Sequence, residues 1–150
     1  MLKLRKAPAP VPKDAELVAS PLPEQCYVGT AGWCVPRASS HRCDGAGTHL
    51  ERYARVFRCA EINSSFHRPH TAATYARWAA STPGEFRFSV KVPKEITHVR
   101  RLRRSREPLE RFLEESAGLG SKRGPLLVQL PPSFEFDARV TGRFLSLLRS

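Results

Sequence analysis

The sequence predicts an α/β fold built from about four β-α units in order along the chain. Short apolar runs alternate with segments whose apolar residues recur at helical spacing. The length of 150 residues suits one domain with a sizeable core. A composition of 41% hydrophobic and 26% charged residues is neither that of a membrane-spanning nor of a fully disordered chain. Strands that alternate with helices indicate a parallel sheet, either doubly wound or part of a (β/α) barrel.

The first 25 residues differ from the rest of the chain. They are poor in bulky apolar side chains and rich in proline: Pro8, Pro10, Pro12, Pro21 and Pro23. We therefore expect residues 1–25 to form a disordered or polyproline-like leader. The folded domain is expected to occupy residues 26–150.

The first predicted unit runs from a short strand at Cys26–Thr30 to a helix that begins near Thr48. Thr48 and Glu51 have the T-x-x-E spacing of a capping box. The apolar residues of this helix fall on one face: Leu50, Tyr53, Ala54 and Phe57. The second unit has a strand at Cys59–Ile62, a polar loop and a helix from about Thr71 to Ala80.

Alternating aromatic and polar residues around Phe88 predict a third strand. Pro108 suits the first turn of the helix that follows. The apolar run Leu126–Leu130 predicts a fourth strand, buried in a parallel sheet. Asp137 is placed to cap a last helix.

The net charge and the short motifs favour some classes of partner and argue against others. The chain carries a net charge of +11, which favours polyanionic or phosphorylated partners. Neither a dinucleotide-binding nor a P-loop glycine pattern is present, and the four cysteines lack C-x-x-C spacing. We expect no metal and no cofactor. No apolar run is long enough to cross a membrane and no signal peptide is recognisable, so the cytosol is the expected compartment.

Four blocks of sequence resemble a known family. They are Val28–Trp33 (VGTAGW), Glu61–Phe66 (EINSSF), Phe86–His98 (FRFSVKVPKEITH) and Gly124–Phe134 (GPLLVQLPPSF). In this order they are similar to the conserved blocks of the YecE-like family, domain of unknown function 72. The resemblance covers residues 26–150. It implies a TIM-barrel-like fold of about 250 residues in full, of which this chain would be the N-terminal half. It implies no known reaction.

The chain departs from the family pattern in two places. Ala31, Cys34 and Val35 replace the usual small hydroxyl and Ser-Tyr, and His67 replaces the usual Tyr. The later blocks of the family are absent. We therefore expect the chain to be a working half-barrel, a truncated product or a non-functional fragment, and the sequence leaves these alternatives open.

Functional side chains of a barrel gather at the carboxyl ends of its strands. The sequence places Trp33, Glu61, Asn63 and Lys91 at such ends, with Gln129 in the fourth strand. Glu61, Lys91 and His98 are the predicted catalytic groups. Trp33, Asn63 and Gln129 are predicted to contact substrate.

Each of these residues also has a structural interpretation. Glu61 and Lys91 are expected at the same level (matching heights) on neighbouring strands. They either orient a substrate or form a structural ion pair that closes the end of the barrel. His98 acts as an acid or base, or is only a solvated neighbour. Trp33 stacks on a ligand or walls the barrel. Asn63 caps the loop, and Gln129 bonds inside the barrel.

Five arginines follow the third strand: Arg100, Arg101, Arg103, Arg104 and Arg106. Guanidinium groups grip phosphates with two parallel hydrogen bonds, so this loop is a candidate phosphate or nucleic-acid site. The alternative is a solvated basic turn paired with the glutamates that follow it: Glu107, Glu110, Glu114 and Glu115.

Two functions of different classes follow. One is an enzyme acting on a small polar or phosphorylated substrate at the strand ends. The other is a nucleic-acid-binding protein that uses residues 100–106. An apolar fourth strand at the open sheet edge also predicts self-association of the chain.

Overall fold

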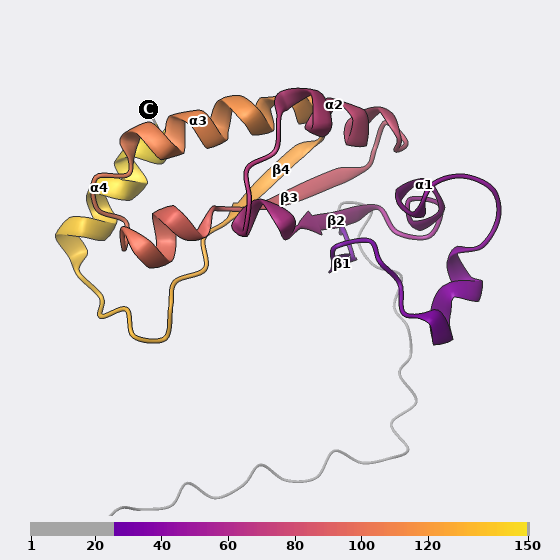
Figure 1. Ribbon diagram of the computed structural model, residues 1–150, viewed down its shortest axis with the longest axis horizontal. Helices are drawn as coiled ribbons and strands as arrows, with labels where there is room; N and C mark the ends of the chain where they lie inside the picture. The colour runs from indigo at the N-terminus through magenta and orange to yellow at the C-terminus, as the bar shows by residue number, and fades with distance from the viewer. Residues whose placement is uncertain (1–25, 150) are drawn as a thin grey trace, which may run out of the picture.

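The computed structural model describes residues 26–149, so the leader predicted at 1–25 lies outside the described residues. The predicted α/β class is confirmed: a four-stranded parallel sheet has the order β1-β2-β3-β4 (Figure 1). The strands are β1 (Gly29–Ala31), β2 (Cys59–Ile62), β3 (Arg87–Lys91) and β4 (Arg123–Leu127). Consecutive parallel neighbours joined through helices are the repeating unit of a TIM-barrel-like fold, here present in part.

The helices follow the predicted order. They are α1 (His49–Tyr53), α2 (Ala72–Ala80), α3 (Arg106–Ser116) and α4 (Ala138–Arg149). Short helical turns join them to the sheet: η1 (Arg37–Cys43), η2 (Ser64–Phe66), η3 (Glu95–Val99, a π-helix) and η4 (Ala117–Lys122). None of the helices formed by residues 26–149 is both long and apolar enough to span a membrane.

The helix starts form as the sequence predicts. At α1 the Thr48 side chain accepts from the Glu51 N–H, and the Glu51 carboxylate accepts from the Thr48 N–H at 2.6 Å. Backbone and side-chain hydrogen bonds from Thr48 lower the pKa of Glu51. At α4, Asp137 Oδ1 accepts from the N–H groups of Arg139 and Val140, both at 3.0 Å. These oxygens satisfy donors that have no partner inside the helix.

The core lies between the sheet and helices α2 and α3, which cover one face of it (Figure 1). Alternation along the strands buries Ala60 and Ile62 on β2 and Phe88 and Val90 on β3. The residues between them point to the opposite face and are only half-buried. The sheet therefore has a helix-covered face and an open face.

Strand β1 is tied to its neighbours by the hydroxyl of Tyr53, a fully buried residue of α1. The Thr30 N–H donates to Tyr53 Oη at 2.7 Å, and Tyr53 Oη donates to the Cys59 carbonyl at 3.0 Å. One phenol thus links the first helix to the first two strands.

The position of the fourth strand corrects the prediction. The apolar run at Leu126–Leu130 was expected to be the strand, but pairing with β3 covers Arg123–Leu127, and the last three residues of the run continue past it. Leu126, Val128 and Leu130 still pack on the core, which explains their apolar character. Pro125 therefore lies inside the strand, beside an irregularity in the pairing, as proline in a sheet commonly does at an edge or bulge.

Candidate functional site

The open face of the sheet carries the two charged residues predicted as catalytic. Glu61 pairs in register with Ser89, and Lys91 lies two residues further along β3. The alternation of the strands puts both side chains on the same face, one pleat apart rather than at matching heights. No ion pair joins them within residues 26–149.

Turn η2 is fixed over the carboxyl ends of β2 and β3 by Ser65. The buried Ser65 hydroxyl lies 2.9 Å from the Ile62 carbonyl and 2.6 Å from the Lys91 carbonyl, and its single proton is shared between them. This anchor places the ring of Phe66 next to Lys91. The Lys91 ammonium lies 4.7 Å from the centre of that ring, in cation–π contact.

Phe66 also brings His98 to the same place. The two rings meet edge to face with centres 5.0 Å apart, and His98 Nδ1 is 2.9 Å from the Thr97 hydroxyl. Lys91 and His98, which come from the end of β3 and from η3, are therefore neighbours around one aromatic ring.

Asn63 begins η2 but does not cap it with its side chain. Its Oδ1 atom is buried and has no hydrogen-bond partner among the described residues. Buried carbonyl oxygens are normally satisfied, and an unpaired one marks a place where a water or ligand donor belongs. The loop-cap interpretation of Asn63 therefore does not describe this geometry.

The remaining predicted contacts lie apart. Gln129 follows β4 instead of lying in it, and is exposed where Val128 and Leu130 turn toward the core. Trp33 packs edge to face against Trp78 and Phe88, with ring centres 5.2 and 6.3 Å away. Because Phe88 belongs to the helix-covered face, the structure does not bring Trp33 to Glu61 and Lys91.

A histidine that sequence reasoning did not single out lies behind η2. His70 Nε2 is 2.8 Å from Ser64 Oγ, and its ring contacts Tyr75 and Trp78. Burial, and secondarily the charge of Arg68, lowers the pKa of His70 below its ordinary value. Neutral His70 and Ser64 together hold the loop between β2 and α2.

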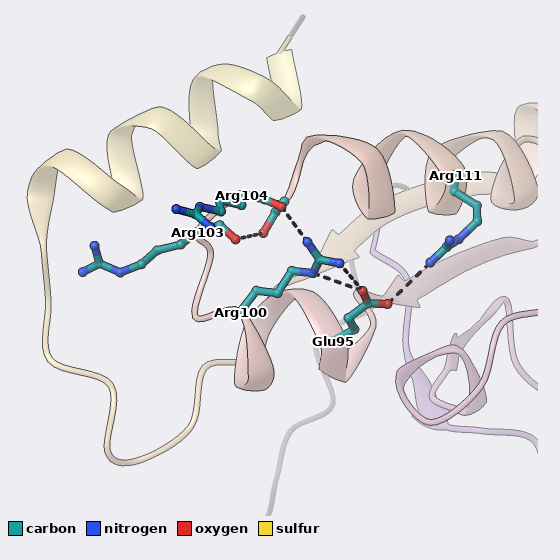
Figure 2. Close-up of polar contacts among 6 residues, drawn as sticks. Glu95, Arg100, Arg103, Arg104 and Arg111 are labelled. Carbon is teal, nitrogen blue, oxygen red and sulfur yellow. Dashed lines mark hydrogen bonds and ion pairs between the residues drawn. The ribbon is translucent and has the colours of Figure 1, made fainter.

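Glu95, a residue of η3, binds the first arginine of the run, Arg100 (Figure 2). Arg100 Nε and Nη2 donate to Glu95 Oε1 at 3.0 and 2.7 Å, and Arg111 Nη2 lies 3.4 Å from Glu95 Oε2. A further Arg100 nitrogen donates to the Arg104 carbonyl at 2.9 Å. Glu95 thus clamps the start of the loop and reaches across to α3.

The other four arginines have different surroundings. Arg101 donates to the Ser133 carbonyl and lies over the ring of Phe134. Arg103 and Arg106 form exposed ion pairs with Asp137 and Glu110, at 3.3 and 3.2 Å. Of the five, only the Arg104 guanidinium has no hydrogen-bond or ion-pair partner within residues 26–149. In Figure 2 the side chains of Arg103 and Arg104 extend away from Glu95.

The backbone of this loop is left-handed at three residues that are not glycine: Arg101, Leu102 and Arg104, with φ of 50°, 65° and 49°. Each such residue costs roughly 1–2 kcal/mol. Burial of Leu102 and the hydrogen bond from its N–H to the Ile96 carbonyl, at 2.9 Å, hold the loop in this shape.

Two residues central to this geometry, Phe66 and Glu95, were not predicted. Phe66 lies three residues after the predicted Asn63, and an aromatic ring so close to a strand end was the signal that could have found it. Glu95 had no comparable signal, because nothing local in the sequence shows that it will pair with Arg100 and Arg111. Among residues 26–149, no cluster of three or more His, Cys, Asp or Glu side chains is placed to hold a metal ion.

The fold of the chain is similar to that of proteins with solved structures. A DUF72 family protein from Enterococcus faecalis V583 superimposes with a TM-score of 0.66 at 21% identity, over 82% of this chain and 46% of that one. A DUF72 family protein from Thermotoga maritima MSB8 gives 0.58 at 27% identity, over 82% of this chain and 50% of that one.

Comparison of the sequence leads to the same family as comparison of the structure. The chain is 32% identical over 108 residues to the UPF0759 protein YecE of Escherichia coli (strain K12), which is 72% of this chain and 38% of that protein. The chain thus spans less than half the length of this curated relative. The family described as "Protein of unknown function DUF72" matches residues 27–150. The resemblance seen in the four sequence blocks is confirmed, and the chain belongs to the DUF72 family.

Proposed function

We propose that the open face at the carboxyl ends of β2 and β3 is the reaction site of a barrel-type enzyme that acts on a small polar or phosphorylated substrate. The observation that carries the proposal is the Oδ1 atom of Asn63, which is buried and has no partner among residues 26–149. Asn63 directly follows β2, the strand that carries Glu61. Within residues 26–149 this acceptor has no donor, and the two charges nearby, Glu61 and Lys91, form no ion pair with each other. This combination favours a polar ligand over a closed structural ion pair.

The residues have distinct roles in this proposal. Lys91, positioned by Phe66 and Ser65, holds an anionic group of the substrate. Glu61 accepts a substrate proton or hydrogen bond, and Asn63 Oδ1 accepts from a substrate hydroxyl or amide. His98 is the nearby acid or base and Gln129 a peripheral contact. Trp33 we assign to the wall of the fold rather than to the substrate.

The domain assignment that accompanies this proposal is that residues 26–150 are the N-terminal part of a barrel. The DUF72 relatives with solved structures are about twice as long as the part matched here. Further strands in a full barrel would face Glu61 and Lys91 and shape the substrate. The activity of a full-length DUF72 protein is for this reason part of the proposal. We also propose a cytosolic location, supported by the four cysteines, all of which are free thiols.

A thermal-shift screen tests the proposed site. Hydroxy acids and sugar phosphates are screened against the full chain, and hits are titrated at about 50 and 200 mM salt. We expect Lys91→Met and Glu61→Gln each to weaken a hit about tenfold, with little dependence on salt. Glu85→Gln, at an exposed position before β3, is the matched control and should bind as the parent does. Hits that bind both site variants unchanged would contradict the assignment.

Nucleic-acid binding through residues 100–106 remains the second candidate. It is favoured by Arg103 and Arg106, whose side chains are 65% and 70% exposed, and by Arg104, whose guanidinium has no partner in the part of the chain that the structure describes. Exposed ion pairs of this kind contribute little, so phosphates can replace the carboxylates. An association constant for nucleic acid that falls steeply with salt concentration would distinguish this function from that of an enzyme.

A further inference from the structure

A cavity of about 260 Å³ lies at the carboxyl ends of β2 and β3, outside the open sheet face. Its walls come from η2, from η3 and from the side of α3 that faces them. Neither Glu61 nor Lys91 lines it, and Phe66 is the wall between this cavity and the Lys91 ammonium. Ligands of parallel α/β folds bind at this end of the strands, which makes the location a favourable one.

The floor and walls of the cavity are largely apolar. Two aromatic rings, Phe66 and Phe112, face it together with Pro69, Pro93 and Pro108. Phe112, a residue of α3, is buried and belongs to the hydrophobic core, so the cavity ends against the core at this point. Rings and proline faces of this kind pack against a flat apolar group of a ligand.

The rim of the cavity is cationic. Arg68, Lys94 and Arg111 line it, and the first two have no ion-pair partner within residues 26–149. Two carboxylates, those of Glu95 and Glu115, also line it, but Glu95 is already bound by Arg100 at 2.7 Å from outside the cavity. The contact from Arg111 to Glu95 is the longest ion pair of the set, 3.4 Å, and the Arg111 side chain is 55% exposed (Figure 2).

We propose that this cavity binds a small anion that carries an apolar ring, with the ring against Phe66 and Phe112 and the anionic group against Arg111 and Lys94. Arg111 can donate from one edge of its guanidinium to a carboxylate or phosphate while Arg100 continues to neutralise Glu95. The rim cations raise the local concentration of anions. An inorganic ion has no apolar part to pack against the walls, so it should bind more weakly than an anion that carries a ring. The volume restricts the ligand to about a dozen heavy atoms.

Phenylphosphonate is a suitable probe because it joins a ring to a dianion in ten heavy atoms or so. Ligand-detected NMR on the full chain measures its binding, and the method tolerates self-association of the protein. We expect a dissociation constant of about 1 mM or below. Inorganic phosphate and benzyl alcohol, which each carry one half of the probe, should bind at least about tenfold more weakly.

Two variants locate the binding. Arg111→Gln and Lys94→Gln should each weaken phenylphosphonate about tenfold. Arg77→Gln is the matched control, because Arg77 is an exposed arginine of α2 that does not line the cavity. All three positions are at the surface, so the variants are expected to fold, and a melting curve of each checks this.

The outcomes separate cleanly. Absence of saturable binding at 20-fold above the expected constant, about 20 mM, would overturn the site, as would unchanged affinity in Arg111→Gln and Lys94→Gln. Equal affinity for inorganic phosphate would overturn the assigned ligand class. Any of these results would leave the proposed site on the open sheet face standing, since Glu61 and Lys91 take no part in this cavity.

Discussion

Replacement of Tyr53 by Phe tests how β1 is held in the sheet. The substitution keeps the buried ring but removes the hydroxyl that accepts from the Thr30 N–H and donates to the Cys59 carbonyl. Strand β1 is only three residues long and all three are exposed, so few other contacts compensate. Each lost hydrogen bond is worth about 1 kcal/mol, which gives a destabilisation of about 2 kcal/mol.

Urea and thermal unfolding measure this loss. For a domain of this size 2 kcal/mol corresponds to a melting temperature about 4–8 °C lower. Hydrogen exchange gives a local readout, since the Thr30 amide should lose protection by about tenfold or more. Tyr27→Phe is the matched control, because Tyr27 is 41% exposed and its ring contact with Arg58 survives the change. A Tyr53→Phe protein as stable as the Tyr27→Phe protein would refute the assigned role of the hydroxyl.

Three further outcomes are expected. The chain should self-associate through the β4 edge and the open sheet face, so light scattering after size exclusion should show a mass above 16.8 kDa; a monomer that persists on concentration contradicts this. Polyanions should bind weakly through Arg100–Arg106, and neutralising the five arginines should flatten the salt slope; an unchanged slope places the binding elsewhere. Because the folded state lowers the pKa of His70, stability should be fully present above its ordinary value of 6.5 and decline as the pH falls below it. His70→Phe should remove that decline in melts between about pH 5 and 8, and a decline that persists assigns it to another group.

Much of the fold could be predicted because its signals are local. The capping box at Thr48 and the cap at Asp137 form as expected, since a helix start depends on a few neighbouring residues. The fourth strand was misplaced because apolar character reports burial rather than pairing. Val128 and Leu130 are apolar because they pack on the core, although β4 has ended before them. The π-helix η3 has no periodic pattern that would have revealed it.

The candidate site could be predicted only in part. Strand alternation was enough to put Glu61 and Lys91 on one face. It was not enough to show that an aromatic ring and not Glu61 would meet the Lys91 ammonium, because that contact depends on how Ser65 fixes η2. The arginine run is a similar case. The expected partners were the glutamates that follow the run: Glu107, Glu110, Glu114 and Glu115. Of these, only Glu110 forms an ion pair within residues 26–149, with Arg106, whereas Glu95 and Asp137 bind Arg100 and Arg103.

The left-handed backbone of the arginine loop has a consequence for limited proteolysis. Trypsin cleaves after arginine and requires an extended peptide in its active site, whereas Arg101, Leu102 and Arg104 hold the chain in a compact reversed path. The cleavage sites after Arg101, Arg103 and Arg104 therefore lie in a backbone shape that the protease cannot use. Cleavage there must wait until Leu102 leaves the core and the loop opens. The rate at which trypsin cleaves between residues 100 and 106 therefore measures the free energy of this local opening. A faster rate would show that the ion pairs of Glu95 with Arg100 and Arg111 have been lost.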